Sequence, residues 1–407
     1  MDSTKKIATA ALIVATLALY NEYNDEEEDD STGNRTSGVA RVYRRNVKLK
    51  ESIMKHMLDT GDDRMYRFLF RMRKKYFDKL LRVYAPIFFS KHLKEDRNVH
   101  RVRTRQIPAR LSLALTLRYL CSSSEAVDSA WDYGLLPSNY SVYMRHGIRC
   151  LNDALDTFKD TSYDVPAWKN LRQFADVITE KENGEIKNVW GAVDGTKLRF
   201  ERSSDFIVEG NAYNGHKQMH CIKLLCVFAP DGSICGAAWG PGVTRDSTLF
   251  NKSTLHGILE LQQRDRPQGT ERLYILGDSA FRNEGVVLQA TSSYIKDPRR
   301  LKIFRRVRNY SEIGIGSLNR CFRRLNNKLP ADDEEHINLI IEATLKMNNY
   351  RVRIARCGQL LRMHREFMYT DSDFEDTEES DEEIDGMDQD DDEEMEKEGD
   401  DSDNNGE

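Results

Sequence analysis

Hydrophobic and polar positions follow two different periods along this chain of 407 residues. Over residues 51–158 apolar side chains recur every three or four positions, which is the spacing of helices that bury one face. From Asn188 onward, short apolar runs end at acidic or turn residues, as buried strands do. The change of period predicts an all-helical region followed by a mixed α/β region.

The second region predicts three successive strands, a helix, a fourth strand and further helices. The first strand begins at Asn188 and ends at Asp194, and the next two, within residues 220–240, are joined by a turn at residues 230–232. The later elements are a helix over 246–262, a strand over 272–278, a helix over 310–328 and a closing helix over 334–356. This order predicts a mixed sheet covered by helices.

Charge is distributed unevenly. Residues 371–407 hold 22 acids and one lysine, and residues 1–33 hold 8 acids and two lysines. The body between them, residues 34–370, carries 58 basic and 37 acidic residues, a net charge of +21, although the whole chain has a net charge of -6. A cationic body favours a polyanionic partner such as DNA. The acidic tail lacks the apolar residues needed for a core, so we predict that it is disordered.

These patterns divide the chain into six segments. They are an apolar and acidic N-terminal segment (1–33), a basic linker with the composition of a nuclear import signal (34–50), a helical region (51–160), a mixed α/β core (185–330), a closing helical segment (331–370) and the acidic tail (371–407).

Two features bear on the cellular compartment. Residues 7–20 are apolar but too short to span a membrane comfortably, and no cleavage site follows them, so we interpret them as a docking helix and expect no membrane association. The seven cysteines form no CxxC pair, which disfavours a zinc ribbon or a disulfide framework and fits a reducing compartment. Together with the basic linker, this predicts a nuclear protein.

Residues 122–155 have the pattern of a helix-turn-helix. Ser124 and Ser138 are suitable helix starts, and Gly134 is suitable for the turn. A second helix from Ser138 would present Arg145 and Arg149 to a DNA groove. Ordinary packing of two short helices explains the same pattern, and both interpretations stay open at this level.

Two predicted strands end in an aspartate, Asp194 and Asp278. If these strands are neighbours, the two carboxylates converge, and such a pair needs shared protons or cations. Mg²⁺ or Mn²⁺, which prefer oxygen ligands, would supply that compensation. A two-metal site then needs a third acid, for which Glu312 on the following helix is the best candidate. A turn aspartate that bonds its own backbone is the alternative for Asp194.

Five motifs, in order, resemble the PIF/Harbinger-type DDE transposases and their domesticated nuclease-like relatives. They are VDGTK, YNGHKQMHCIKLLCVFAPDGSI, GVTRDSTLF, LGDSAF and RNYSEIGIGSLNRCFRRL. The resemblance implies an RNase H-like fold in which Asp194, Asp278 and Glu312 hold the catalytic metals. It also implies a separate Myb-like DNA-binding partner protein, and leaves the assembly of a homo-oligomer open.

The resemblance also draws attention to Asp246, which matches a recurrent aspartate outside the triad. Of a supporting role at the site and a helix N-cap, we favour the cap. Gly314 and Gly316 weaken the helix that carries Glu312, by about 1 kcal/mol each relative to alanine. Gly314 has no counterpart in the family pattern and is therefore the odder of the two.

Two further groups are candidates for substrate contacts. Tyr213, His216 and Lys217 precede the predicted hairpin, where they would reach the scissile phosphate or would simply form a polar strand entry. A basic run between the second and third acids would hold the DNA backbone, if it is more than a solvated face. Its members are Arg299, Arg300, Lys302, Arg305, Arg306 and Arg308.

The sequence therefore predicts a metal-dependent DNA nuclease or transposase that cleaves phosphodiester bonds by a two-metal DDE mechanism. The alternative is a domesticated DNA-binding or chromatin adaptor that keeps the transposase fold and its acids but no longer cuts.

Overall fold

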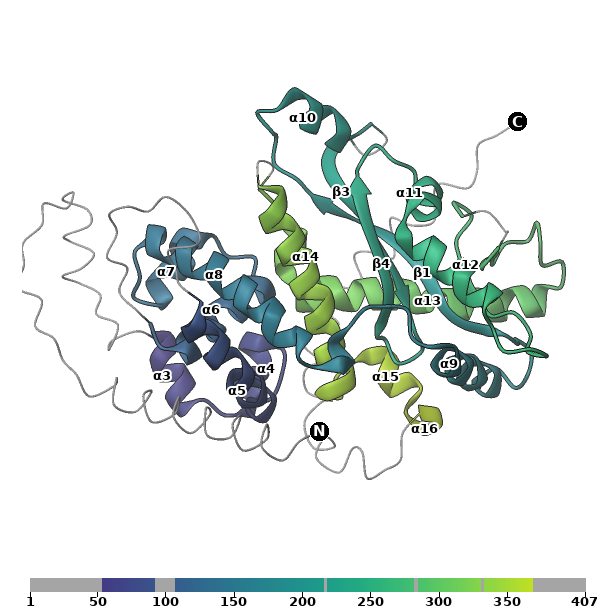
Figure 1. Cartoon of the computed structure of the whole chain (residues 1–407), viewed down its shortest axis with the longest axis horizontal. Helices are drawn as coiled ribbons and strands as arrows, with labels where there is room; N and C mark the ends of the chain where they lie inside the picture. Colours follow the sequence, from purple (N-terminus) through teal and green to yellow (C-terminus); the bar gives the residue numbers. More distant parts are fainter. Residues whose placement is uncertain (1–52, 92–106, 216–217, 282–284, 331–332, 369–407) are drawn as a thin grey trace, which may run out of the picture.

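The computed structural model describes residues 53–91, 107–215, 218–281, 285–330 and 333–368. Helices at one end of this part of the chain adjoin a mixed sheet with helices on both faces (Figure 1). The N-terminal segment, the basic linker and the acidic tail predicted from the sequence lie outside the described residues.

The first helices form a compact bundle around α6. Their bounds are α3 (Ile53–Thr60), α4 (Asp63–Phe70), α5 (Lys74–Ser90), α6 (Ala109–Cys121), α7 (Ala126–Asp132) and α8 (Pro137–Asp156), followed by the 3-10 turn η3 (Lys159–Thr161). Eleven of the 13 residues of α6 are buried, as expected for a helix that is apolar nearly all round. Asp62 caps α4 by accepting a hydrogen bond from the Met65 N–H at 2.9 Å.

The sheet combines antiparallel and parallel strands in the order β2-β3-β1-β5-β6, with β4 also paired to β3. The strands are β1 (Val189–Arg199), β2 (Tyr213–Asn214), β3 (Met219–Phe228), β4 (Ile234–Pro241), β5 (Tyr274–Gly277) and β6 (Val287–Gln289). Strand β3 is antiparallel to β1, β2 and β4, whereas β1, β5 and β6 run parallel to one another. The mixed sheet expected from the sequence is thus present.

The remaining helices cover the sheet and close the chain. They are α9 (Trp168–Lys181), α10 (Phe206–Ala212), α11 (Asp246–Lys252), α12 (Thr254–Arg264), α13 (Pro298–Cys321), the 3-10 turn η4 (Arg323–Asn326), α14 (Glu334–Asn349), the π-helical turn η5 (Tyr350–Ile354), α15 (Gln359–Met363) and α16 (Arg365–Met368).

Each face of the sheet has its own apolar cluster. On one face, Trp190 and Val193 of β1 pack with residues of α9, α11 and α12. On the other face, Ala192 of β1 and Leu276 of β5 pack with Val307 and Tyr310 of α13. Alternating side chains of β1 therefore bind helices on opposite faces, which fixes the strand in the middle of the domain.

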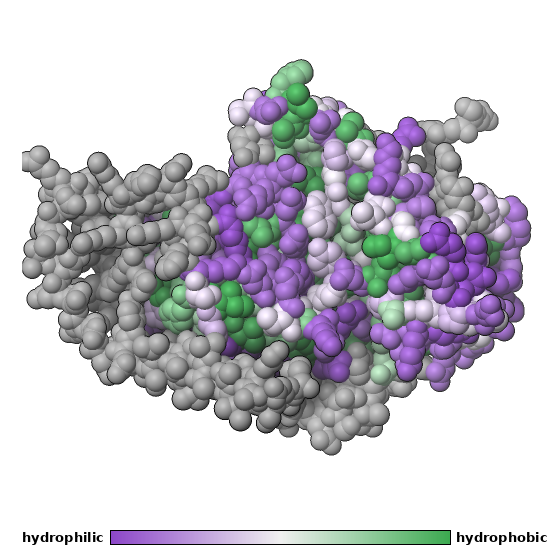
Figure 2. Space-filling model, in the orientation of Figure 1, coloured by the Kyte–Doolittle hydropathy of each residue, from purple (hydrophilic) through white to green (hydrophobic). Residues whose placement is uncertain are grey.

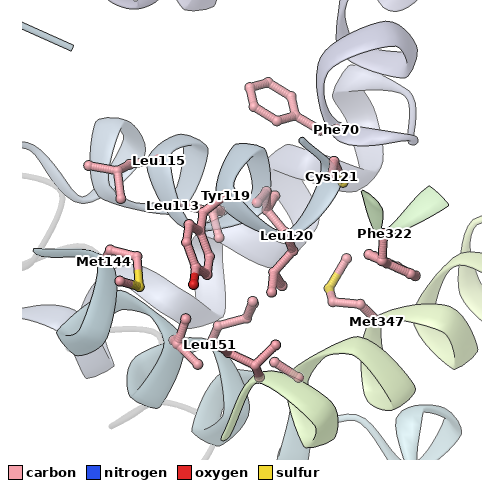
Figure 3. Packing of buried hydrophobic residues seen from close by; sticks show 14 of the residues in the cluster. Phe70, Leu113, Leu115, Tyr119, Leu120, Cys121, Met144, Leu151, Phe322 and Met347 are labelled. Atoms are coloured by element: carbon pink, nitrogen blue, oxygen red, sulfur yellow. The ribbon is translucent and has the colours of Figure 1, made fainter. Parts of the chain in front are cut away.

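A continuous core joins the first helices to the rest of the protein. Figure 3 shows Phe70, Leu120 and Leu151 of that bundle on one side, with Met347 of α14 and Phe322 on the other. The hydroxyl of Tyr350 donates a hydrogen bond to the backbone carbonyl of Tyr76 at 2.8 Å across the same boundary. Helix α14 is therefore the layer between the bundle and the sheet.

Several predicted boundaries are corrected. Strand β1 does not end at Asp194 but continues to Arg199, because Gly195 and Thr196 pair with Leu225 and Leu224 of β3. The helix that carries Glu312 begins at Pro298 and ends at Cys321. The predicted helix 246–262 is two helices separated at Ser253, whose side chain accepts a hydrogen bond from His256 of α12. The turn at residues 230–232 is confirmed, with Gly232 at φ 83°.

Helix α10 projects beyond the sheet and was not predicted. It carries apolar side chains into solvent, with Phe206 86% and Ile207 72% exposed, and apolar surface gathers over this tip (Figures 1 and 2). In the part of the chain that the structure describes, no helix is both long and apolar enough to cross a membrane.

Candidate active site

Asp194 and Asp278 lie at the same level of neighbouring parallel strands. In the pairing of β1 with β5, Ala192 is opposite Leu276, and each aspartate comes two residues later. Ala192 and Leu276 both pack against α13, so the side chain of Asp194, which alternates with that of Val193, is directed to the same face as Ala192. Asp278 is the first residue after β5. The register thus brings the two predicted acids together under α13.

Burial raises the pKa of Asp194 to about 6. The hydrogen bond from the Gly195 N–H, at 2.7 Å, opposes the rise, as does the positive charge of Arg308, whereas the negative charges of Asp278 and Glu312 add to it. The charges of Asp278 and Glu312 therefore both act on Asp194, so the three predicted acids lie close enough to interact electrostatically. The single backbone hydrogen bond does not compensate the buried carboxylate, and the turn that was the alternative interpretation of Asp194 does not form, because β1 continues to Arg199.

The other two acids differ in their exposure: Asp278 is half-buried like Asp194, whereas Glu312 is exposed. Asp278 is partly buried and accepts a hydrogen bond from the Ala280 N–H at 2.8 Å. Glu312 lies on the exposed side of α13, with 47% of its side chain accessible, and forms an ion pair with Arg308 one turn earlier. Glu312 is therefore free to change its side-chain conformation, whereas Asp194 is held by the sheet.

Close packing of α13 on the sheet positions Glu312, and it explains Gly314. A Cβ at Gly314 would lie 2.4 Å from Cδ1 of Phe228 on β3, whereas a Cβ at Gly316 would meet nothing within 4 Å. The glycine that is odd by helix propensity is thus required by the contact between helix and sheet. Val307, Tyr310 and Leu318 are buried along the same face of α13.

The donor set suits a hard divalent cation. Three carboxylates supply oxygen ligands of the kind that Mg²⁺ and Mn²⁺ prefer, and a cation would stabilise the ionised form of Asp194 that burial disfavours. Within the described residues, no group of three or more His, Cys, Asp or Glu side chains is already close enough to hold a metal ion. The acids fit the metal in chemistry, and Glu312 would have to turn toward it.

Residues 193–349 match the family model described as DDE superfamily endonuclease. The match starts one residue before Asp194 and ends with α14, so it contains Asp278 and Glu312 as well. Neither the curated proteins nor the solved structures gave a match.

The match supports a DDE transposase-like family, and the mixed sheet with flanking helices is consistent with a DDE nuclease fold. We call residues 193–349 the DDE region. It covers the sheet from the middle of β1 onward and the helices α10 to α14, whereas the helical bundle of α3–α8 lies outside it.

Asp246 of the DDE region has a structural partner. Its carboxylate forms an ion pair with the Lys223 ammonium at 2.6 Å, while Arg245, not Asp246, occupies the N-cap position of α11. The favoured interpretation as a cap was therefore wrong. Lys223 is only 8% exposed, and a buried cation needs a counter-charge, which accounts for the position of Asp246. A lysine inside the apolar run CIKLLCVF was the signal for this pair.

The polar residues before the hairpin are only partly described. Tyr213 begins β2, is 43% exposed, and places its ring 5.2 Å from that of His220. His216 and Lys217 lie outside the described residues.

Arg145 and Arg149 form ion pairs with other residues of the protein. Arg145 forms an ion pair with Asp333, the N-cap of α14, and Arg149 pairs with Glu335 at 3.0 Å. Their helix, α8, packs against α5, α6 and α14 and starts at Pro137, with Gly134 in the preceding turn at φ 63°. The two helices and the turn are present, and the contacts of Arg145 and Arg149 with α14 and its N-cap favour the ordinary packing interpretation of the two that the sequence left open.

The six basic residues of α13 predicted to contact DNA fall into two groups, four without an ion pair to any described residue and two that pair with acids of the protein. Arg299, Arg300, Lys302 and Arg305 are exposed on the first half of α13, and the described part of the chain shows no ion pair for them. Arg306 pairs at 3.2 Å with Glu182, whose side chain is only 2% exposed, and Arg308 pairs with Glu312. Four cations are thus accessible to a ligand, while two hold acids of the protein itself.

Proposed function

We propose that this protein is a metal-dependent DNA endonuclease or transposase of the PIF/Harbinger type, with an RNase H-like core and Asp194, Asp278 and Glu312 as its DDE triad. The observation that carries the proposal is the register of β1 and β5, which sets Asp194 and Asp278 side by side beneath the helix of Glu312. The DDE superfamily match over residues 193–349 supports it independently.

The three acids would hold Mg²⁺ or Mn²⁺. Such ions activate a water or a 3'-hydroxyl for attack on the phosphodiester and stabilise charge on the leaving oxygen. In this assignment Asp194 and Asp278 form the fixed part of the site, because the sheet determines their separation, and Glu312 is the adjustable ligand on the exposed side of α13.

The substrate would contact the first half of α13. Arg299, Arg300, Lys302 and Arg305 are exposed cations on the helix that leads to Glu312, and contacts to phosphate position DNA without reading its sequence. The net charge of +21 over residues 34–370 supports the same substrate. A nuclear location and a Myb-like partner belong to the proposal as well; the first rests on the basic linker and the second on the family resemblance.

The test is Mn²⁺-dependent cleavage of supercoiled DNA by the purified protein and by its Asp194→Asn variant, which is nearly isosteric. We expect nicking by the parent protein, none by the variant, and equal DNA binding by both. Equal DNA binding without cleavage by either would instead favour the adaptor that retains the fold. Omitting the metal and adding a chelator are the matched controls.

A further inference from the structure

Glu312, which a metal site would need as its third ligand, forms an ion pair with Arg308. The guanidinium of Arg308 contacts the Glu312 carboxylate one helical turn away, and it also lowers the pKa of Asp194. One cation of the protein therefore acts on two of the three acids. A divalent metal at these acids would compete with Arg308 for Glu312 and would be repelled by its charge.

The backbone of α13 cannot relieve this competition. Val307 and Tyr310, on either side of Arg308, are buried, and Gly314 lies directly on the ring of Phe228. Movement of the helix would break the contact between Gly314 and Phe228, whereas rotation of the Arg308 and Glu312 side chains would leave it intact. With 23% of Arg308 and 47% of Glu312 accessible, exchange of partners by side-chain rotation is the available route.

DNA supplies the alternative partner for Arg308. Arginine binds phosphate through the same planar fork that binds carboxylate. Arg305 lies one turn before Arg308 and is exposed, so a phosphate backbone that follows the accessible cations of α13 arrives next to Arg308. Once a phosphate holds Arg308, Glu312 is released toward Asp194 and Asp278.

We propose that Arg308 couples DNA binding to assembly of the metal site. In the free protein it sequesters Glu312, and on the DNA complex it transfers to a phosphate and frees Glu312 for the metal. Because binding coupling is reciprocal, metal must tighten DNA binding by the same factor by which DNA tightens metal binding. This inference rests on the proposed function, since it takes the three acids as the metal ligands.

The test is calorimetric titration of Mn²⁺ into the full-length protein, with and without a short duplex carrying non-hydrolysable phosphorothioate linkages. We expect the duplex to tighten Mn²⁺ binding to the parent protein by about two- to fivefold or more, the range that partly exposed ion pairs allow. Arg308→Gln should tighten Mn²⁺ binding in the absence of DNA by a similar factor and should abolish most of the effect of the duplex.

Arg323→Gln is the matched control, because it removes one positive charge from an exposed side chain just beyond the end of α13, outside both the triad and the proposed DNA contact. Its Mn²⁺ affinity without DNA should stay close to that of the parent protein. The coupling would be overturned if the two substitutions changed Mn²⁺ affinity equally, or if the parent protein bound Mn²⁺ equally well with and without the duplex. Either result would leave the nuclease proposal intact. If Asp194→Asn did not change Mn²⁺ binding, or if the parent protein bound no Mn²⁺, the nuclease proposal itself would be overturned. Thermal melts of each variant confirm that the fold is retained.

Discussion

Gly314 of α13 and Phe228 of β3 are in such close contact that no side chain fits between them: a Cβ at Gly314 would lie 2.4 Å from the ring. This contact fixes the height of α13 above the sheet and, two residues earlier on the helix, the position of Glu312 relative to Asp194. The distance between the acids of the sheet and Glu312 of the helix therefore depends on a glycine that has no functional side chain.

Gly314→Ala should destabilise the protein although alanine is the better helix former. The gain in helix propensity is about 1 kcal/mol, whereas overpacking against a buried ring costs about 1–3 kcal/mol and displaces the helix. Gly316→Ala, two positions along the same helix in open space, should stabilise by up to about 1 kcal/mol. Urea denaturation of the two variants measures the difference, and an equal response would contradict the role given to Phe228.

The pair of Lys223 and Asp246 should behave as a structural unit. Asp246→Asn would leave the Lys223 ammonium, which is 8% exposed, without its counter-charge, and we expect a loss of about 1–3 kcal/mol in the free energy of unfolding. Lys223→Met combined with Asp246→Asn should cost less than the two single changes added together. A double-mutant cycle by chemical denaturation determines this coupling, and additive losses would argue against the pair.

Stability should fall with acid because of His364. This histidine is fully buried; burial lowers its pKa to about 4, and its ring contacts the Tyr310 hydroxyl at 2.9 Å and the Leu360 carbonyl at 3.0 Å. The unfolded chain binds this proton near pH 6.5 and the folded chain only near 4, so stability is lost as the pH falls through that window, by up to about 3 kcal/mol.

His364→Gln removes the titrating group and should flatten this part of the stability profile. The measurement is the difference in unfolding free energy between parent and variant from pH 7 to pH 4, which cancels the groups that both proteins share. A difference that stays constant with pH would show that His364 is not held neutral in the fold.

DNA affinity should depend on α13 and not on α8. Replacing Arg299, Arg300, Lys302 and Arg305 with glutamine should weaken binding and lower the salt slope of log K by about 0.9 for each phosphate that is no longer neutralised. Arg145→Gln with Arg149→Gln should leave the salt slope unchanged but reduce stability, since these side chains hold Asp333 and Glu335 of α14. Binding titrations between low and moderate salt separate the two groups, and a reduced slope for the α8 variant would restore its DNA-binding interpretation.

Local pattern alone located the helical region, the strands β1, β3, β4 and β5 and the positions of the acids, but it missed α9, α10, β2 and β6. The apolar runs before Asp194 and Asp278 identified two strands, although not that they are neighbours, and the turn before Ser233 was readable from its proline and glycine, because these signals lie within a few residues of one another. The i, i+4 spacing of Arg308 and Glu312 was also visible in the sequence, although its meaning was not.

Tertiary structure decided what each of those residues does. Strand β1 passes through Asp194 because β3 supplies partners beyond it, and Gly314 is required because Phe228 lies beneath it. Arg145 forms an ion pair with Asp333, which is 188 positions away. The sequence by itself determined the helical and the mixed α/β regions, most of the strands and the positions of the carboxylates, since propensity and periodicity are local. Only packing determined register, depth of burial and choice of ion-pair partner, because those energies arise between segments that are distant along the chain.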